Sequence, residues 1–176
     1  MKLDRMILYL NAEFFGLIAV SKQGGNMEIR KYSSKYRAQC IEAFESNIGQ
    51  YFDSSERAEF IEYLDALSES SEYYVCLESD SEKLLGCGGI GLKSSVASLA
   101  WGLVHKDFHG QGIGTQLTDF RLSYIKNNTS LHKVKIETSQ HTQGFYEKRG
   151  FTVTKTIPNG FGAGIDCVVM ELCISR

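Results

Sequence analysis

The alternation of hydrophobic and polar residues divides the chain from Met27 onward into strands and helices. Alternating or short continuous apolar runs, typical of half-buried and buried strands, fall at 27–31, 73–77, 83–92, 96–104, 134–137, 151–157 and 166–174. Apolar residues three or four apart, which mark one face of a helix, predict helices beginning near Ser33, over 54–69, after Gly112 and over 143–149. The predicted order is therefore β-α-α-β-β-β-α-β-α-β-β.

This order predicts the fold class. The strands between 73 and 104 follow one another with short polar turns, which favours an antiparallel meander and excludes a doubly wound parallel sheet. The chain has 176 residues and no repeat or linker, a length that fits one compact domain. We predict a single α+β domain with a mixed, mostly antiparallel central sheet flanked by helices.

Residues 1–26 differ in pattern from the rest of the chain. Met6–Val20 is apolar and resembles a secretory leader, but Asn11 and Glu13 interrupt it and no small-residue cleavage site comes after it. The run is also shorter than the stretch of about 20 apolar residues that spans a bilayer. We predict that the domain occupies 27–176 and that 1–26 is an apolar extension, either accessory to the domain or an amphipathic helix packed on it.

Composition narrows the classes of partner. The net charge is −2, from 19 basic and 21 acidic residues, so the chain lacks the basic excess of a nucleic-acid binder. Five cysteines are scattered without a Cys-x-x-Cys pair, which argues against a disulfide framework and a zinc site. We expect reduced thiols in a cytoplasmic protein, with no metal, no nucleic acid and no membrane.

Two glycine clusters compete for a binding role. Gly86–Gly91 fits G-x-G-x-x-G, but a strand comes after it, whereas a dinucleotide loop must open a helix. His109–Thr115 does follow a strand and opens an amphipathic helix. Glycines let backbone N–H groups converge on an anion, and the helix N-terminus adds the positive end of its dipole. The cluster has no Lys-Ser/Thr pair at its end, so the loop favours a phosphate or pyrophosphate over a nucleoside triphosphate; the alternative is a turn that binds nothing.

The second cluster also carries a resemblance. The stretch LVHKDFHGQGIGTQL is similar to the Arg/Gln-x-x-Gly-x-Gly/Ala signature of the GCN5-related N-acetyltransferase (GNAT) family, and SQHTQGFYEKRGF resembles that family's Tyr-x-x-x-Gly-Phe helix and turn. The order of elements from Met27 to Cys173 matches the family's fold. The resemblance therefore implies a GNAT-like domain that uses acetyl-CoA.

The resemblance also implies residue roles. Val104 would offer backbone groups to the pantetheine arm, and Tyr146 would protonate the departing thiolate. The CoA pyrophosphate would lie on the glycine loop and its backbone amides: His109, Gly110, Gln111, Gly112, Ile113, Gly114 and Thr115. Ser139 stands where the family often has an Asn, and His109 stands where it has Arg or Gln.

The general base stays open at this point. Some relatives carry a Glu on the strand before the glycine loop, but 96–104 has no carboxylate. An amine must lose a proton before it attacks a carbonyl. The candidates are Glu137, His105 and a water relay.

The function we expect is transfer of an acetyl group from acetyl-CoA to a primary amine of a small molecule or peptide, directly and in a ternary complex. The alternatives are a non-catalytic acyl-CoA-binding module and a structural domain with an empty loop. Tyr51, Phe52 and Phe161 are candidate lining residues for the acceptor, and the acidic residues between Glu69 and Asp80 could attract a cationic amine. The sheet edges of such a fold could also pair two copies, so monomer and homodimer both stay open.

Overall fold

The computed structural model describes residues 18–19, 27–93 and 95–175. The helices are α1 (Arg37–Glu45), α2 (Glu56–Asp65), α3 (Ile113–Asn128) and α4 (Gln143–Glu147). The strands are β1 (Ile18–Ala19), β2 (Met27–Lys31), β3 (Glu72–Glu78), β4 (Leu84–Lys93), β5 (Val96–Val104), β6 (Lys133–Thr138), β7 (Thr152–Gly162) and β8 (Ile165–Cys173). From Met27 onward this is the predicted α+β order.

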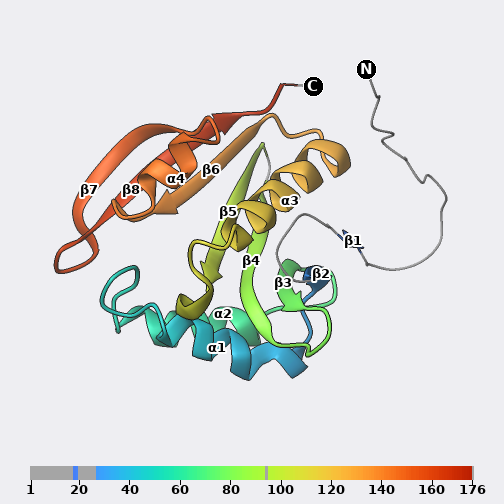
Figure 1. Cartoon of the computed structure of the whole chain (residues 1–176). Coiled ribbons are helices and arrows are strands. Elements are labelled where there is room, and N and C mark those ends of the chain that lie inside the picture. The colour runs from blue at the N-terminus through green and yellow to red at the C-terminus, as the bar shows by residue number, and fades with distance from the viewer. Residues whose placement is uncertain (1–17, 20–26, 94, 176) are drawn as a thin grey trace, which may run out of the picture.

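The strands form one sheet in the order β1-β2-β3-β4-β5-β6-β8-β7. Every neighbouring pair is antiparallel except β5 and β6, which run parallel. The parallel register runs from Ala97 opposite Val134 to Leu99 opposite Ile136 and then stops. Because β5 continues to Val104 and β6 to Thr138, the two strands part beyond this point and leave a wedge in the sheet (Figure 1).

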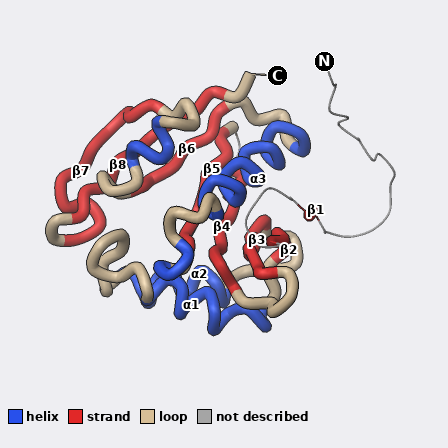
Figure 2. The backbone as a smooth tube through the Cα atoms, in the orientation of Figure 1, coloured by secondary structure: helices blue, strands red, loops and turns tan. Residues whose placement is uncertain are grey.

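Helices cover both faces of the sheet, as Figure 2 shows in blue against the red strands. One face packs against α1 and α2 through a buried cluster that includes Phe44, Phe60 and Leu103. The other face packs against α3 and α4 through a cluster that includes Leu99, Leu117 and Tyr146. The sheet is therefore the middle layer of a three-layer domain.

A bulge in β5 lies next to the wedge. Cys87 pairs with Leu103 and Gly89 with Ala100, so Trp101 and Gly102 together face the single residue between them on β4. Trp101 has a φ of 43°, a left-handed conformation that is uncommon for a residue with a side chain. The bulge bends β5 away from a regular course, and residues on its two sides no longer alternate in register.

Glycine and proline misled the prediction at the end of the chain. The segment 158–164, predicted as a loop, instead continues β7 to Gly162 and turns directly into β8. Pro158 is tolerated because β7 is an outer strand, where a missing backbone N–H costs no ladder bond. The β7–β8 hairpin therefore extends as far as the α1–α2 loop (Figure 1).

The second helix is shorter than predicted, running from Glu56 to Asp65 rather than over 54–69. Its start has the expected capping residues. Glu56 Oε2 accepts the Asp53 N–H at 2.8 Å, and Asp53 Oδ1 accepts the Ser55 N–H at 2.9 Å. These bonds fix the loop that leads into α2.

The prediction for 1–26 lies outside the described residues, apart from Ile18–Ala19. Those two residues pair antiparallel with Ile29 and Glu28 of β2. In the part of the chain that the structure describes, no helix is both long and apolar enough to cross a membrane.

Candidate active site

A cleft of about 1090 Å³ opens where β5 and β6 part. Its walls are the glycine loop with the start of α3, the ends of β5 and β6, the α1–α2 loop and the β7–β8 hairpin. Almost all residues predicted for cofactor binding and catalysis line it: Val104, His109, Gly110, Gly112, Ile113, Gly114, Thr115, Ser139 and Tyr146. Gln111 lies between two of these, and its side-chain amide donates to Asp107 O at 3.4 Å.

The glycine loop provides backbone donors at one end of the cleft. Gly110 and Gly112 have φ values of 76° and 81°, which glycine adopts without strain. The first backbone bond of α3 is from the Gln116 N–H to Gly112 O, at 3.0 Å. The N–H groups of Ile113 to Thr115 belong to the helix's first turn, which has no carbonyls to receive them. This is the geometry of an anion site at a helix N-terminus.

The end of β5 lies close to this loop. A Cβ on Gly114 would be 3.5 Å from Cγ2 of Val104, an ordinary contact distance, so the start of α3 lies directly beside the end of β5. The Val104 carbonyl accepts a hydrogen bond from Asn47 Nδ2 at 2.9 Å, and His109 Nε2 lies 2.9 Å from the same oxygen. Of the Val104 backbone groups predicted to serve the pantetheine arm, the carbonyl is therefore already bonded within the protein.

Tyr146 lies in α4 at the inner wall of the cleft. Its ring is buried and meets Phe145 and Phe151 edge-on, at centroid distances of 5.0 and 5.5 Å. Burial raises the pKa of this phenol, while the charges of Arg121 and Arg149 and a hydrogen bond from Arg121 lower it. The net shift is upward, so at neutral pH the phenol holds its proton and can donate it.

Ser139 is buried just before α4. Its carbonyl accepts the N–H groups of Thr142 and Gln143, at 3.0 and 3.1 Å. The structure thus gives Ser139 a role in starting the helix that carries Tyr146, in addition to its place on the cleft wall.

The opposite half of the cleft is made of side chains. Tyr51, Phe52 and Phe161 all line it, as the sequence predicts. A Cβ on Gly162 would lie 2.8 Å from Asp53 Oδ2, so the β7–β8 hairpin rests against the α1–α2 loop and bounds this half.

Comparison with known proteins identifies the family. The family described as "Acetyltransferase (GNAT) domain" matches residues 32–174. The chain belongs to the GNAT acetyltransferase family. No curated protein matches the sequence.

Solved structures show the same GNAT fold at low sequence identity. Ard1 from Thermoplasma volcanium has 20% identity and a TM-score of 0.70, over 85% of this chain and 99% of that one. The acetyltransferase yncA from Salmonella typhimurium, solved with its cofactor acetyl-CoA, has 19% identity and a TM-score of 0.62, over 86% and 96%. An aminoglycoside 6'-N-acetyltransferase complexed with coenzyme A has 16% identity and a TM-score of 0.62, over 84% and 98%.

Two of the three carboxylates at the GNAT cleft were not singled out in the sequence analysis, whereas the third, Glu137, was one of the candidate bases. Glu56 and Glu59 of α2 line it together with Glu137 of β6. The pKa of Glu56 is raised. Burial is the largest cause and the neighbouring Glu59 adds to it, while the hydrogen bond from the Asp53 N–H acts in the opposite direction. The spacing of Glu56 and Glu59 could have predicted that they act together, since residues three apart share a helix face.

The three candidate bases separate in space. Glu137 lines the cleft, with Oε1 2.7 Å from Lys135 Nζ. His105 is not among the lining residues, and its Nδ1 accepts the Asp107 N–H at 3.3 Å. A carboxylate or a water held by one is thus better placed than His105.

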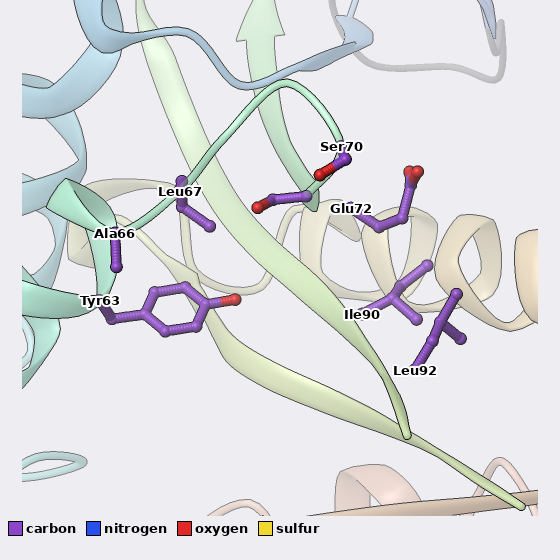
Figure 3. Close-up of a pocket in the computed structure, with 8 residues that line it drawn as sticks. Tyr63, Ala66, Leu67, Ser70, Glu72, Ile90 and Leu92 are labelled. Atoms are coloured by element: carbon purple, nitrogen blue, oxygen red, sulfur yellow. The ribbon is translucent and has the colours of Figure 1, made fainter. Parts of the chain in front are cut away.

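The acidic residues from Glu69 to Asp80 do not line this cleft. Glu72 borders a separate hollow of about 320 Å³, between the end of α2 and strands β3 and β4 (Figure 3). Its carboxylate is already engaged by Tyr74 and by Lys31 Nζ, the latter at 3.3 Å. The acidic run is therefore surface charge away from the cleft.

The five cysteines all lie in the described part of the chain, and their thiols are free. All but Cys173 are buried. Within residues 27–93 and 95–175, no three His, Cys, Asp or Glu side chains are grouped as metal ligands would be.

Proposed function

We propose that the chain transfers an acetyl group from acetyl-CoA to a primary amine, directly and within a ternary complex. One observation carries the proposal: unpaired amides of the glycine loop and the buried phenol of Tyr146 open into one cleft. The first suits a pyrophosphate and the second suits a departing thiolate. The structural neighbours that hold acetyl-CoA or coenzyme A support this choice of donor.

In this mechanism the donor's phosphates lie on the amides of Ile113 to Thr115, and its thioester lies near Tyr146. The amine nitrogen attacks the thioester carbonyl, a carbon–nitrogen bond forms and the carbon–sulfur bond breaks. Tyr146 gives its proton to the leaving sulfur. The proton lost by the amine passes to a cleft carboxylate, Glu56 or Glu137, directly or through water.

The side chains in the half of the cleft opposite the glycine loop favour a cationic acceptor. Glu56 and Glu59 place negative charge on the wall, whereas Glu137 is paired with Lys135. Tyr51 and Phe161 offer aromatic faces. The acceptor we propose is therefore a small molecule or peptide with a primary amine. Free thiols support a reducing, cytoplasmic location.

A second candidate is a non-catalytic acyl-CoA-binding module. The observation that favours it is the Val104 carbonyl, which Asn47 and His109 already engage. The two functions differ in turnover rather than in donor binding.

Calorimetric titration of the full chain with acetyl-CoA and with desulfo-CoA tests the proposal. We expect micromolar binding of both, near −8 kcal/mol, followed by release of free CoA thiol when a panel of primary amines is added. Binding without thiol release for any amine would support the module instead. No binding at millimolar ligand would overturn both functions.

A further inference from the structure

Helix α3 carries a charged residue where its buried face is otherwise apolar. Arg121 follows Leu117 by four residues and precedes Ile125 by four, so all three lie on one face. Its side chain is 1% exposed and is the largest of the fully buried side chains. Taking a guanidinium out of water is costly unless an opposite charge accompanies it.

No such charge accompanies Arg121 within the described part of the chain. Its hydrogen bonds go to neutral oxygens and are long: Nε to Leu117 O at 3.3 Å, Nη1 to Gly89 O at 3.4 Å and Nη2 to Thr118 Oγ1 at 3.2 Å. Each of the other described arginines pairs with a carboxylate, although all are more exposed: Arg30, Arg37, Arg57 and Arg149.

The sheet is shaped to hold this side chain. A Cβ on Gly88 would lie 2.8 Å from Arg121 Nη1, and one on Gly102 would lie 2.8 Å from Nη2. The guanidinium therefore fills the space beneath the β5 bulge that two glycines leave open. Those glycines come from neighbouring strands, so the accommodation involves the sheet as well as the helix.

The same side chain lines the cleft, beside Tyr146 and the end of β5. A guanidinium has five N–H groups, and the three bonds to neutral oxygens leave one on each terminal nitrogen. The positive charge of Arg121 acts on the phenol of Tyr146, whose pKa it lowers against the larger effect of burial. A phenol carries no charge, so the positive charge is still uncompensated at the place where the reacting groups must meet.

We propose that Arg121 binds a carboxylate carried by one of the two reactants, either the acyl group of the donor or the acceptor amine. Its planar fork matches the two oxygens of a carboxylate, and the pairing would supply the missing opposite charge. Its place beside Tyr146 favours the acyl group, as in a dicarboxylic acyl-CoA. The inference rests on the proposed transfer from a CoA thioester to an amine. If the donor carries the carboxylate, the preferred acyl group is a dicarboxylic one in place of acetyl.

The donor arm of the test compares matched acyl groups on the full chain. Calorimetry is performed with succinyl-CoA, which ends in a carboxylate, and with butyryl-CoA, which has the same number of acyl carbons and no charge. We expect succinyl-CoA to bind about 10- to 100-fold more tightly, the range of a charge-assisted hydrogen-bonded pair. Arg121→Met should abolish this difference, and Arg121→Lys should retain part of it.

The acceptor arm uses acetyl-CoA as donor and compares β-alanine with β-alaninamide by thiol release. A preference of tenfold or more for β-alanine that Arg121→Met removes would assign the carboxylate to the acceptor. Arg149→Met is the matched control, since Arg149 already pairs with Asp119 (Nε to Oδ1, 3.2 Å). It should leave both preferences unchanged.

Equal binding of succinyl-CoA and butyryl-CoA, together with no preference for β-alanine, would overturn the proposal even if acetyl-CoA still binds. These comparisons use only the wild-type protein, so they test the proposal even if Arg121→Met fails to fold. Failure of every CoA thioester to bind would instead overturn the proposed function. The two failures are therefore distinguishable.

Discussion

The half of the cleft proposed to bind the donor and the half proposed to bind the acceptor are built in different ways. The donor half uses main-chain groups of one continuous segment, from Val104 to Thr115, arranged by glycines and a helix start. The acceptor half gathers side chains from α1–α2, β6 and the β7–β8 hairpin, which are far apart in sequence. A common donor can be held by backbone alone, whereas the choice of acceptor requires side chains that can change independently.

The largest expected effect tests whether backbone geometry holds the donor. Gly112→Val combined with Gly114→Val should weaken acetyl-CoA binding by about 1000-fold or more, since several amide–phosphate bonds would be lost together. Valine is strained at the φ of 81° found for Gly112, and its branches would enter the open space beside the loop, where the phosphates are proposed to lie. Calorimetry measures the loss.

Gly164→Val is the matched control for that double variant. Gly164 has a φ of 79° and, like Gly112, open space where a Cβ would be. The backbone strain is similar, but it falls on the acceptor side, so donor binding should persist. Equal loss in both variants would mean that strain, and not the loop's amides, explains the result.

The next effect separates chemistry from binding within the donor half. Tyr146→Phe removes the proton donor, so kcat should fall by about 100-fold while the Kd for acetyl-CoA changes less than about twofold. Because burial raises the pKa of Tyr146, its active, protonated form should persist to pH values above the ordinary phenol value of about 10. Steady-state rates between pH 6 and 10 check this, and a variant with unchanged kcat would remove Tyr146 from the chemistry.

A smaller effect should appear only in the acceptor half. Glu59→Gln removes one wall carboxylate, so the KM of a cationic amine should rise up to about fivefold, the range of a solvent-accessible charge pair. The Kd for acetyl-CoA should stay the same. Glu62→Gln, on the same helix but not on the cleft wall, should change neither constant. A weakened Kd in Glu59→Gln would mean that the two halves are not independent.

The smallest effect concerns the loop that bounds the acceptor half. Hydrogen bonds from the Ser55 hydroxyl and N–H lower the pKa of Asp53 below its unfolded value. Its contribution to stability is therefore present above pH of about 4 and is lost as the pH falls through the lower folded value. Urea unfolding at pH 7 and pH 3 should show a slightly smaller acid loss in Asp53→Asn than in the wild type. Asp80→Asn, in the turn before β4, controls for the removal of a charge, and an identical acid loss in all three proteins would contradict the prediction.

The glycine loop at one end of the cleft could be predicted from the sequence because its determinants are local. Glycines that adopt positive φ, a strand before them and an amphipathic helix after them all lie within one short segment. The acceptor carboxylates were missed because Glu56 and Glu59 reach the cleft only through the packing of α2 on the sheet. The extent of β7 was missed because Pro158 and its neighbouring glycines indicate a loop unless the strand is known to be an outer one.

Arg121 shows a third reason why the sequence alone could not predict the whole cleft. Its four-residue spacing from Leu117 and Ile125 was visible in the sequence, but an arginine on such a row is ordinarily placed at the edge of the buried face. The space that admits it comes from Gly88 and Gly102 on two paired strands. No pattern within a single helix indicates that these glycines lie opposite it.

The extra residue in β5 has a consequence for how such a cleft can arise or disappear. Leu99 packs in the core on the α3 side of the sheet and Leu103 in the core on the α1 side. Residues four apart on a regular strand would instead share one face. Deleting Trp101 would restore the regular alternation of β5 side chains between the two faces of the sheet. Gly102 and Val104 would keep the faces that they now occupy. We expect a straightened β5 to continue its pairing with β6 as far as Thr138, which would narrow the opening between them. A single inserted residue thus separates the observed sheet, with its opening, from one in which β5 and β6 stay paired further along.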